Sequence, residues 1–137
     1  MTYDEMLEKQ QACKSIRKRP ADEEHRLQVS CVRLFRMKHP QLTSLLIAVP
    51  NGGRRDAVTG AKLKAEGVVA GVSDLLLLVA RNGYHGLCIE MKTPKGRQQD
   101  TQREWQKAVE AQGFRYVLCR SVEEFMKETG NYLDTGE

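Results

Sequence analysis

The segment 71–92 constrains the fold of this chain more than any other part of the sequence. It contains an apolar run at 75–80, a turn signal at 81–83 and a second apolar run at 86–91, which together predict a β-hairpin. Because side chains alternate faces along a strand, the second strand has an apolar face and a face that carries Cys88, Glu90 and Lys92. A carboxylate and an ammonium group therefore share one face of the predicted sheet.

The length of the hairpin loop decides whether Asp74 joins that face. A two-residue turn would place Asp74 opposite Met91, on the wrong side, whereas a three-residue loop at 81–83 would place it across from Glu90. A slip of one residue turns every side chain of a strand over. A site that uses both acids thus requires an odd-length loop or a bulge.

Each of these residues also has a simpler interpretation. Asp74 could terminate the turn that follows Gly71, since aspartate is common in such loops. Glu90 and Lys92 could form the solvated face of an edge strand. Taken together, their shared face and their spacing favour a functional site.

Length and composition indicate one globular domain. The chain has 137 residues, of which 40% are hydrophobic and 29% are charged, as in soluble globular proteins. No apolar run is long enough to span a bilayer, and the N-terminus is too polar for a signal peptide. The four cysteines are scattered, which favours reduced thiols in a cytoplasmic protein over zinc ligands or disulfides.

Basic residues flank the hairpin in a chain whose formal net charge is +4. Positive charge beside carboxylates suits a polyanion held against a metal ion, although an ordinary solvated surface is the alternative. Arginine grips phosphate in a bidentate manner, and two arginines directly follow a glycine loop that permits close backbone approach. The basic residues concerned are Arg54, Arg55, Lys62 and Lys64 before the hairpin and Lys92, Lys95 and Arg97 after it.

The rest of the chain predicts helices that alternate with strands. Residues 1–20 are interpreted as an N-terminal arm and residues 21–137 as the folded domain. We expect a helix at 22–38 capped by Asp22, a strand at 45–49 and a short helix at 56–66 that ends at Gly67. After the hairpin we expect a helix that opens at Asp100 or Thr101, with a Thr101–Glu104 capping box, then a strand at 116–119 and a helix capped by Ser121. This order indicates an α/β sandwich with a mixed sheet flanked by helices.

Two acids in the first helix are candidates for the same site. Glu23 and Glu24 both lie in the first turn, where acids stabilise a helix through its dipole. Glu24 lies one turn before Leu27 and Gln28, at the edge of the apolar stripe, and could reach a cleft. Spacing alone does not decide whether Glu23 or Glu24 reaches the site.

Gly71-Val72-Ser73-Asp74 followed by Ile89-Glu90-Met91-Lys92 resembles the PD-(D/E)XK nuclease superfamily, and more narrowly its VRR-NUC branch, the virus-type replication-repair nucleases. The resemblance extends from Glu24 to Gln102 and less distinctly to residue 132. Ser73 stands where the family usually has proline, a change that affects the backbone more than the chemistry.

The resemblance implies a restriction-endonuclease-like fold and a site for Mg²⁺ or Mn²⁺, which prefer oxygen ligands. It implies that Asp74, Glu90 and the Met91 carbonyl bind the metal, and that Glu24 holds a second ion or a water. Lys92 would act through its charge, and Gln102 would position the phosphate or the attacking water. The expected DNA contacts are Asn51, Arg54, Arg55, Lys95 and Arg97.

These features favour a metal-dependent endonuclease that acts on branched DNA, such as four-way (Holliday) junctions, in phage or mobile-element replication and repair. The resemblance to the compact viral members of the family implies a homodimer, for which the apolar residues of 58–69 are candidates. The alternative is a nucleic-acid-binding module of the same fold that has lost catalysis or depends on a partner.

Overall fold

The computed structural model describes residues 2, 3, 5, 20–50 and 57–134. In chain order they form helix α2 (Pro20–Lys38), the 3-10 helix η1 (Pro40–Leu45), strand β1 (Leu46–Ala48), helix α3 (Ala57–Ala65), strands β2 (Leu75–Leu77) and β3 (Leu87–Met91), helix α4 (Asp100–Ala111), strand β4 (Arg115–Cys119) and helix α5 (Val122–Leu133). No helix in these segments is both long enough and apolar enough to cross a membrane.

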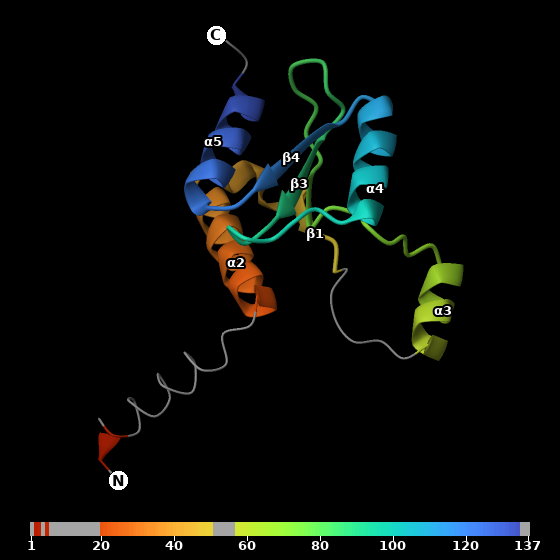
Figure 1. The fold of residues 1–137 in the computed structure, drawn as a ribbon. Helices are drawn as coiled ribbons and strands as arrows, with labels where there is room; N and C mark the ends of the chain where they lie inside the picture. Colours follow the sequence, from red (N-terminus) through yellow and green to blue (C-terminus); the bar gives the residue numbers. More distant parts are fainter. Residues whose placement is uncertain (1, 4, 6–19, 51–56, 135–137) are drawn as a thin grey trace.

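The four strands form one mixed sheet in the order β1-β2-β3-β4, which confirms the predicted fold class. The β1–β2 and β2–β3 pairs are antiparallel, and β3 pairs with β4 in parallel. Helices α2 and α5 cover one face of the sheet, and α4 lies against the other (Figure 1). Helix α3 stands apart from the sheet in the same view.

The main core fills the space between the sheet and the α2–α5 layer. Phe35 from α2 and Phe125 from α5 meet edge to face, with ring centroids 6.4 Å apart. Alternate residues of the central strands point into this layer, as the period of two requires. The fully buried members on β2 and β3 are Leu75, Leu77, Leu87, Ile89 and Met91.

The hairpin combines a two-residue turn with a bulge. Of the two alternatives that the sequence left open, the odd-length loop is absent and the bulge is present: Arg81 pairs with Tyr84 around Asn82 and Gly83, whose φ angles are 53° and 84°. Positive φ at both positions matches a type I′ turn, the favoured tight hairpin connection.

A bulge then restores the register that the turn alone would lose. Between the Arg81–Tyr84 bridge and the Leu77–Leu87 pair, three residues on one side face two on the other. Leu75 pairs with Ile89, so the next step along the ladder brings Asp74 level with Glu90.

Several predicted boundaries are corrected by the structure. Helix α2 already begins at Pro20, which suits a first helical position, so Asp22 lies in its first turn and is not the cap. Leu45 belongs to η1, and β2 ends at Leu77 because the bulge follows it. Other predictions are confirmed: Gly67 follows α3 with φ of 107°, and the Ser121 side chain accepts from the Glu124 N–H at the start of α5.

The start of α4 differs in its cap. Gln99 is the N-cap residue, and the Gln102 side chain accepts a hydrogen bond from the Gln99 N–H at 2.7 Å. The predicted Thr101–Glu104 box is therefore wrong, although the geometry is that of a capping box shifted two residues earlier.

Gly71 lets the segment before β2 lie against the start of α4. Its φ is 88°, and a Cβ atom placed on it would lie 2.3 Å from the Thr101 carbonyl oxygen and 2.9 Å from the Gln102 nitrogen. Both neighbours are backbone atoms, so they cannot turn aside as a side chain would. Glycine at this position thus sets how closely the loop that carries Asp74 approaches α4.

We predict that Gly71→Ala destabilises the protein by roughly 2 kcal/mol or more, because it adds backbone overlap to the cost of a left-handed residue. Gly83→Ala is the matched control: φ is 84° there, and nothing lies within 4 Å of the added Cβ. Urea unfolding of both variants measures the difference. Equal losses of unfolding free energy would show that the contact with α4 contributes nothing.

Candidate active site

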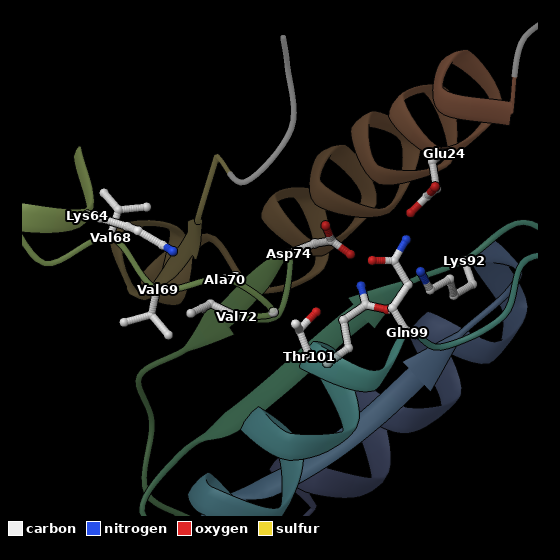
Figure 2. A pocket seen from close by; sticks show the side chains of 12 residues that line it. Glu24, Lys64, Val68, Val69, Ala70, Val72, Asp74, Lys92, Gln99 and Thr101 are labelled. Atoms are coloured by element: carbon white, nitrogen blue, oxygen red, sulfur yellow. The ribbon is translucent and has the colours of Figure 1, made fainter. Parts of the chain in front are cut away.

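A pocket of about 470 Å³ lies where α2, the loop before β2, the end of β3 and the start of α4 meet (Figure 2). Its polar side chains come from elements far apart in the sequence, and the segment 68–72 lines its other end. The polar residues that line it are Glu24, Lys64, Asp74, Lys92, Gln99, Thr101 and Gln102.

Asp74 lies just before β2 and is tied to the neighbouring strand. Its Oδ2 atom accepts a hydrogen bond from the Met91 N–H at 2.7 Å. Burial raises the pKa of Asp74 above its usual value, and the nearby charge of Glu90 raises it further, against the lowering effect of the Met91 hydrogen bond. The carboxylate is thus held in place in an environment that disfavours its charge.

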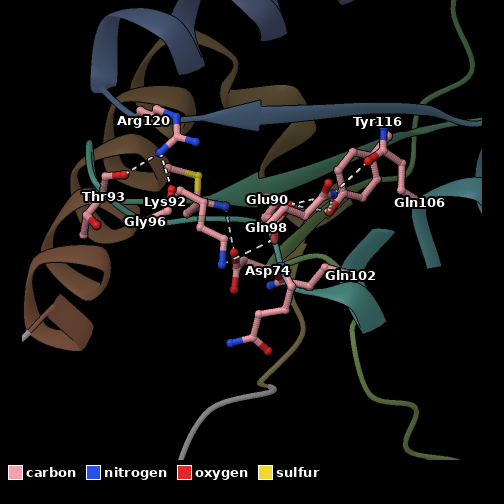
Figure 3. A network of polar contacts seen from close by, with 12 residues as sticks. Asp74, Glu90, Lys92, Thr93, Gly96, Gln98, Gln102, Gln106, Tyr116 and Arg120 are labelled. Atoms are coloured by element: carbon pink, nitrogen blue, oxygen red, sulfur yellow. Dashed lines mark hydrogen bonds and ion pairs between the residues drawn. The ribbon is translucent and has the colours of Figure 1, made fainter. Parts of the chain in front are cut away.

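Glu90 lies beneath the pocket and does not line it, since its exposed fraction is 0%. Its Oε2 atom accepts hydrogen bonds from the Tyr116 hydroxyl at 2.6 Å and from Gln98 Nε2 at 3.2 Å (Figure 3). Its Oε1 atom lies 3.6 Å from Lys92 Nζ and receives no hydrogen bond from any residue that the structure describes. The two oxygens of one carboxylate therefore have different surroundings.

Lys92 follows β3 directly, and 9% of its side chain is exposed. It lines the pocket and also contacts Glu90, so its ammonium group lies between the buried acid and the cavity. This places a positive charge next to both acids of the hairpin.

Of the two acids in the first helix, Glu24 is the one that lies at the pocket. Its carboxylate points toward the cavity in Figure 2, and Glu23 is exposed and absent from the lining. Burial raises the pKa of Glu24, and the charge of Asp74 raises it further. Glu24 and Asp74 therefore both face the pocket, and Glu90 lies beneath it.

The remaining predicted residues lie in different places. Gln102 is half-buried and lines the pocket while it caps α4. Lys95 and Arg97 are exposed on the loop between β3 and α4. Asn51, Arg54 and Arg55 lie outside the described residues.

Sequence reasoning missed the residues that support the site from behind. Tyr116 and Gln98 hold Glu90, and Gln98 Nε2 also donates to Gln106 Oε1 at 2.8 Å. Arg120 Nη1 donates to the Thr93 carbonyl at 2.8 Å and to the Gly96 carbonyl at 2.6 Å, which holds the loop after Lys92. The alternation of β4 does place Tyr116 on the Glu90 face, but the pattern is equally typical of a core aromatic residue.

The buried charge of Asp74 generates a prediction about stability. Because the pKa of Asp74 is raised in the folded chain, ionising this carboxyl lowers the free energy of unfolding. This loss of stability is absent at low pH, where the group is protonated, and complete above the pKa of the folded state. Asp74→Asn keeps an oxygen acceptor for the Met91 N–H and removes the charge. In a chelating buffer we expect its unfolding midpoint to exceed the wild-type value by a few degrees at neutral pH, and the gap to close as the pH falls towards about 4.

Asp100→Asn is the control, since Asp100 is an exposed aspartate at the start of α4. Thermal unfolding across the pH range should show no gain for this variant. A lower midpoint for Asp74→Asn at neutral pH would contradict the argument from burial.

Comparison with known proteins identifies the family. The family model described as "VRR-NUC domain" matches residues 8–123, which is most of the chain. A solved structure described as a "VRR_NUC domain protein" is 24% identical with a TM-score of 0.72, and the likeness covers 83% of this chain and 90% of that one, which shows the same fold. No curated protein gives a significant match. The chain therefore belongs to the VRR-NUC family, a family of the nuclease type.

Proposed function

We propose that this protein is a metal-dependent DNA endonuclease that hydrolyses phosphodiester bonds with Asp74, Glu90 and Lys92 as its central residues. The observation that carries the proposal is the arrangement at the hairpin: Asp74, just before β2, lies level with Glu90 on β3, and Lys92 both contacts Glu90 and lines the pocket. Carboxyl groups that line a pocket and whose pKa is raised by burial and by neighbouring charges, as for Glu24 and Asp74, are typical of functional sites.

The donor atoms fit a hard divalent cation. Asp74 and Glu90 supply carboxylate oxygens, and Glu90 Oε1 is buried without a hydrogen bond from the described residues. Within that part of the chain, no three His, Cys, Asp or Glu side chains lie close enough to hold a metal ion by themselves. Asp74 and Glu90 would hold Mg²⁺ or Mn²⁺ with the Met91 carbonyl, and Glu24 would contribute to a second ion or an ordered water. Such an ion activates water and takes up charge on the phosphate.

The other side chains act on the substrate. Lys92 stabilises the negative charge that develops on the phosphate, because its ammonium group is fixed by Glu90 at the floor of the pocket. Gln102 positions the phosphate or the attacking water from the first turn of α4. Lys95 and Arg97 are exposed on the adjoining loop and contact the DNA backbone, together with Asn51, Arg54 and Arg55. The nuclease domain spans 21–137, after an N-terminal arm at 1–20.

Cleavage should require a divalent metal and all three central residues. We expect Asp74→Asn, Glu90→Gln and Lys92→Ala each to lower the cleavage rate by about 100-fold or more, while DNA binding largely survives because phosphate contacts elsewhere supply affinity. Cleavage of labelled DNA in Mn²⁺ measures the first effect, and a mobility shift in chelator measures the second.

Lys107→Ala controls for the general loss of a positive charge, since Lys107 is exposed on α4. Full activity of the wild type in chelator, or of Glu90→Gln in Mn²⁺, would refute this site. Binding without cleavage in any metal would instead support the catalytically inactive module.

The substrate we propose is branched DNA, cut by a homodimer. A four-way junction has two-fold symmetry when opened on a protein surface, and two symmetric nicks resolve it, which a C₂ dimer supplies by presenting one pocket twice. Val58 on α3 and Val68 and Val69 after it are exposed apolar residues and are candidates for the interface.

Light scattering at micromolar concentration should therefore give twice the monomer mass. Cleavage of a four-way junction should exceed that of a linear duplex of the same sequence. Val58→Lys should shift the mass towards the monomer and reduce junction resolution, with single nicks in place of paired ones. A monomeric wild type that prefers flaps would overturn this part and leave the nuclease proposal intact.

A further inference from the structure

Both hydrogen bonds that Glu90 accepts from the described side chains go to the same carboxylate oxygen. Tyr116 and Gln98 both donate to Oε2, at 2.6 Å and 3.2 Å, and the donors also lie 3.4 Å from each other. Two donors that converge on one atom fix both the position and the rotation of the carboxylate plane. Oε1 is thereby turned toward Lys92 Nζ, 3.6 Å away.

Packing holds these donors in turn. Gln98 Nε2 donates to Gln106 Oε1 at 2.8 Å, which anchors the end of the β3–α4 loop to α4 (Figure 3). The Tyr116 ring lies edge to face against Trp105, with centroids 6.2 Å apart. The parallel register pairs Tyr116 with Cys88, so its ring and Glu90 lie on the same face of the sheet. The donors are thus fixed before any ligand arrives.

We propose that Tyr116 and Gln98 are positioning residues that hold Glu90 so that Oε1 alone is presented to a divalent cation. This inference rests on the proposed metal-dependent nuclease function. Tyr116 lies on β4, 26 residues after Glu90 in the sequence. Hydrogen bonds of this kind orient carboxylate ligands and raise the affinity of the site for metal.

A purely structural role makes a different prediction. A buried carboxylate needs donors in any protein, and loss of the Tyr116 hydroxyl would then lower stability without changing the binding of a metal. The two roles separate when metal affinity and stability are measured on the same variants.

The chain offers a matched control in Tyr132. Its hydroxyl is also buried and donates to the Val79 carbonyl at 2.5 Å, on the other face of the sheet. Tyr132→Phe removes the same atom and the same kind of hydrogen bond without touching Glu90. Any effect of Tyr116→Phe that is shared with Tyr132→Phe is therefore structural.

The experiment is calorimetric titration of the full chain with Mn²⁺ in the absence of DNA, with thermal unfolding recorded for each variant. We expect Tyr116→Phe to weaken Mn²⁺ binding by roughly 10- to 100-fold, the range for lost partners of metal ligands. Gln98→Met, at a half-buried position, should weaken it in the same direction and serves if Tyr116→Phe does not fold. Tyr132→Phe should leave the affinity unchanged.

Glu90→Gln distinguishes a failure of the proposed metal site from a failure of the positioning role. If the wild type fails to bind Mn²⁺, or if Glu90→Gln binds as tightly as the wild type, the nuclease site and this inference fall together. If Glu90→Gln loses binding while Tyr116→Phe and Gln98→Met bind like the wild type, only the positioning role is overturned. An equal loss of affinity in Tyr132→Phe also overturns it.

Discussion

Side chains of a strand alternate between two faces, so two strands can combine their functional groups only if their register agrees. In this hairpin the tight turn at Asn82 and Gly83 would by itself place Asp74 and Glu90 on opposite faces of the sheet. One extra residue between Leu77 and Arg81 brings them to the same face. Asp74 and Glu90 lie level across adjacent strands because of that residue. The meeting of Asp74 with Glu90 and Lys92 on one face of the sheet depends on this offset.

The two faces of the sheet have opposite effects on the stability of the fold. The face toward α2 and α5 buries aliphatic and aromatic side chains and supplies stability. The other face buries Glu90 completely and places Asp74 and Glu24 near it, and burial raises the pKa of both of these carboxyls. Like charges that are held close together and partly buried oppose folding, so their presence favours a functional explanation over a structural one.

The sequence was sufficient for the order of elements, the mixed sheet and the shared face of Asp74 and Glu90, because each depends on local period and on short-range pairing. The sequence did not decide whether a bulge or an odd-length loop brings Asp74 and Glu90 to one face, since both leave the same pattern of apolar residues. Nor did it find Tyr116, whose contact with Glu90 is set by the parallel pairing of β3 with β4 and not by any local signal. The cap of α4 was misplaced because glutamine is a weak cap in sequence terms, and tertiary context chose Gln99 over Thr101.

Arg120 connects the end of the sheet to the loop that carries Lys95 and Arg97. Its guanidinium group donates to three carbonyls of that loop, at Thr93, Pro94 and Gly96, and the backbone N–H of Arg120 donates to the Glu124 side chain on α5. Conformational entropy that a loop has already lost on folding is not lost again on association. Under the proposed function, Lys95 and Arg97 would meet the DNA backbone from a loop that is already ordered, so little further loop entropy would be lost on binding.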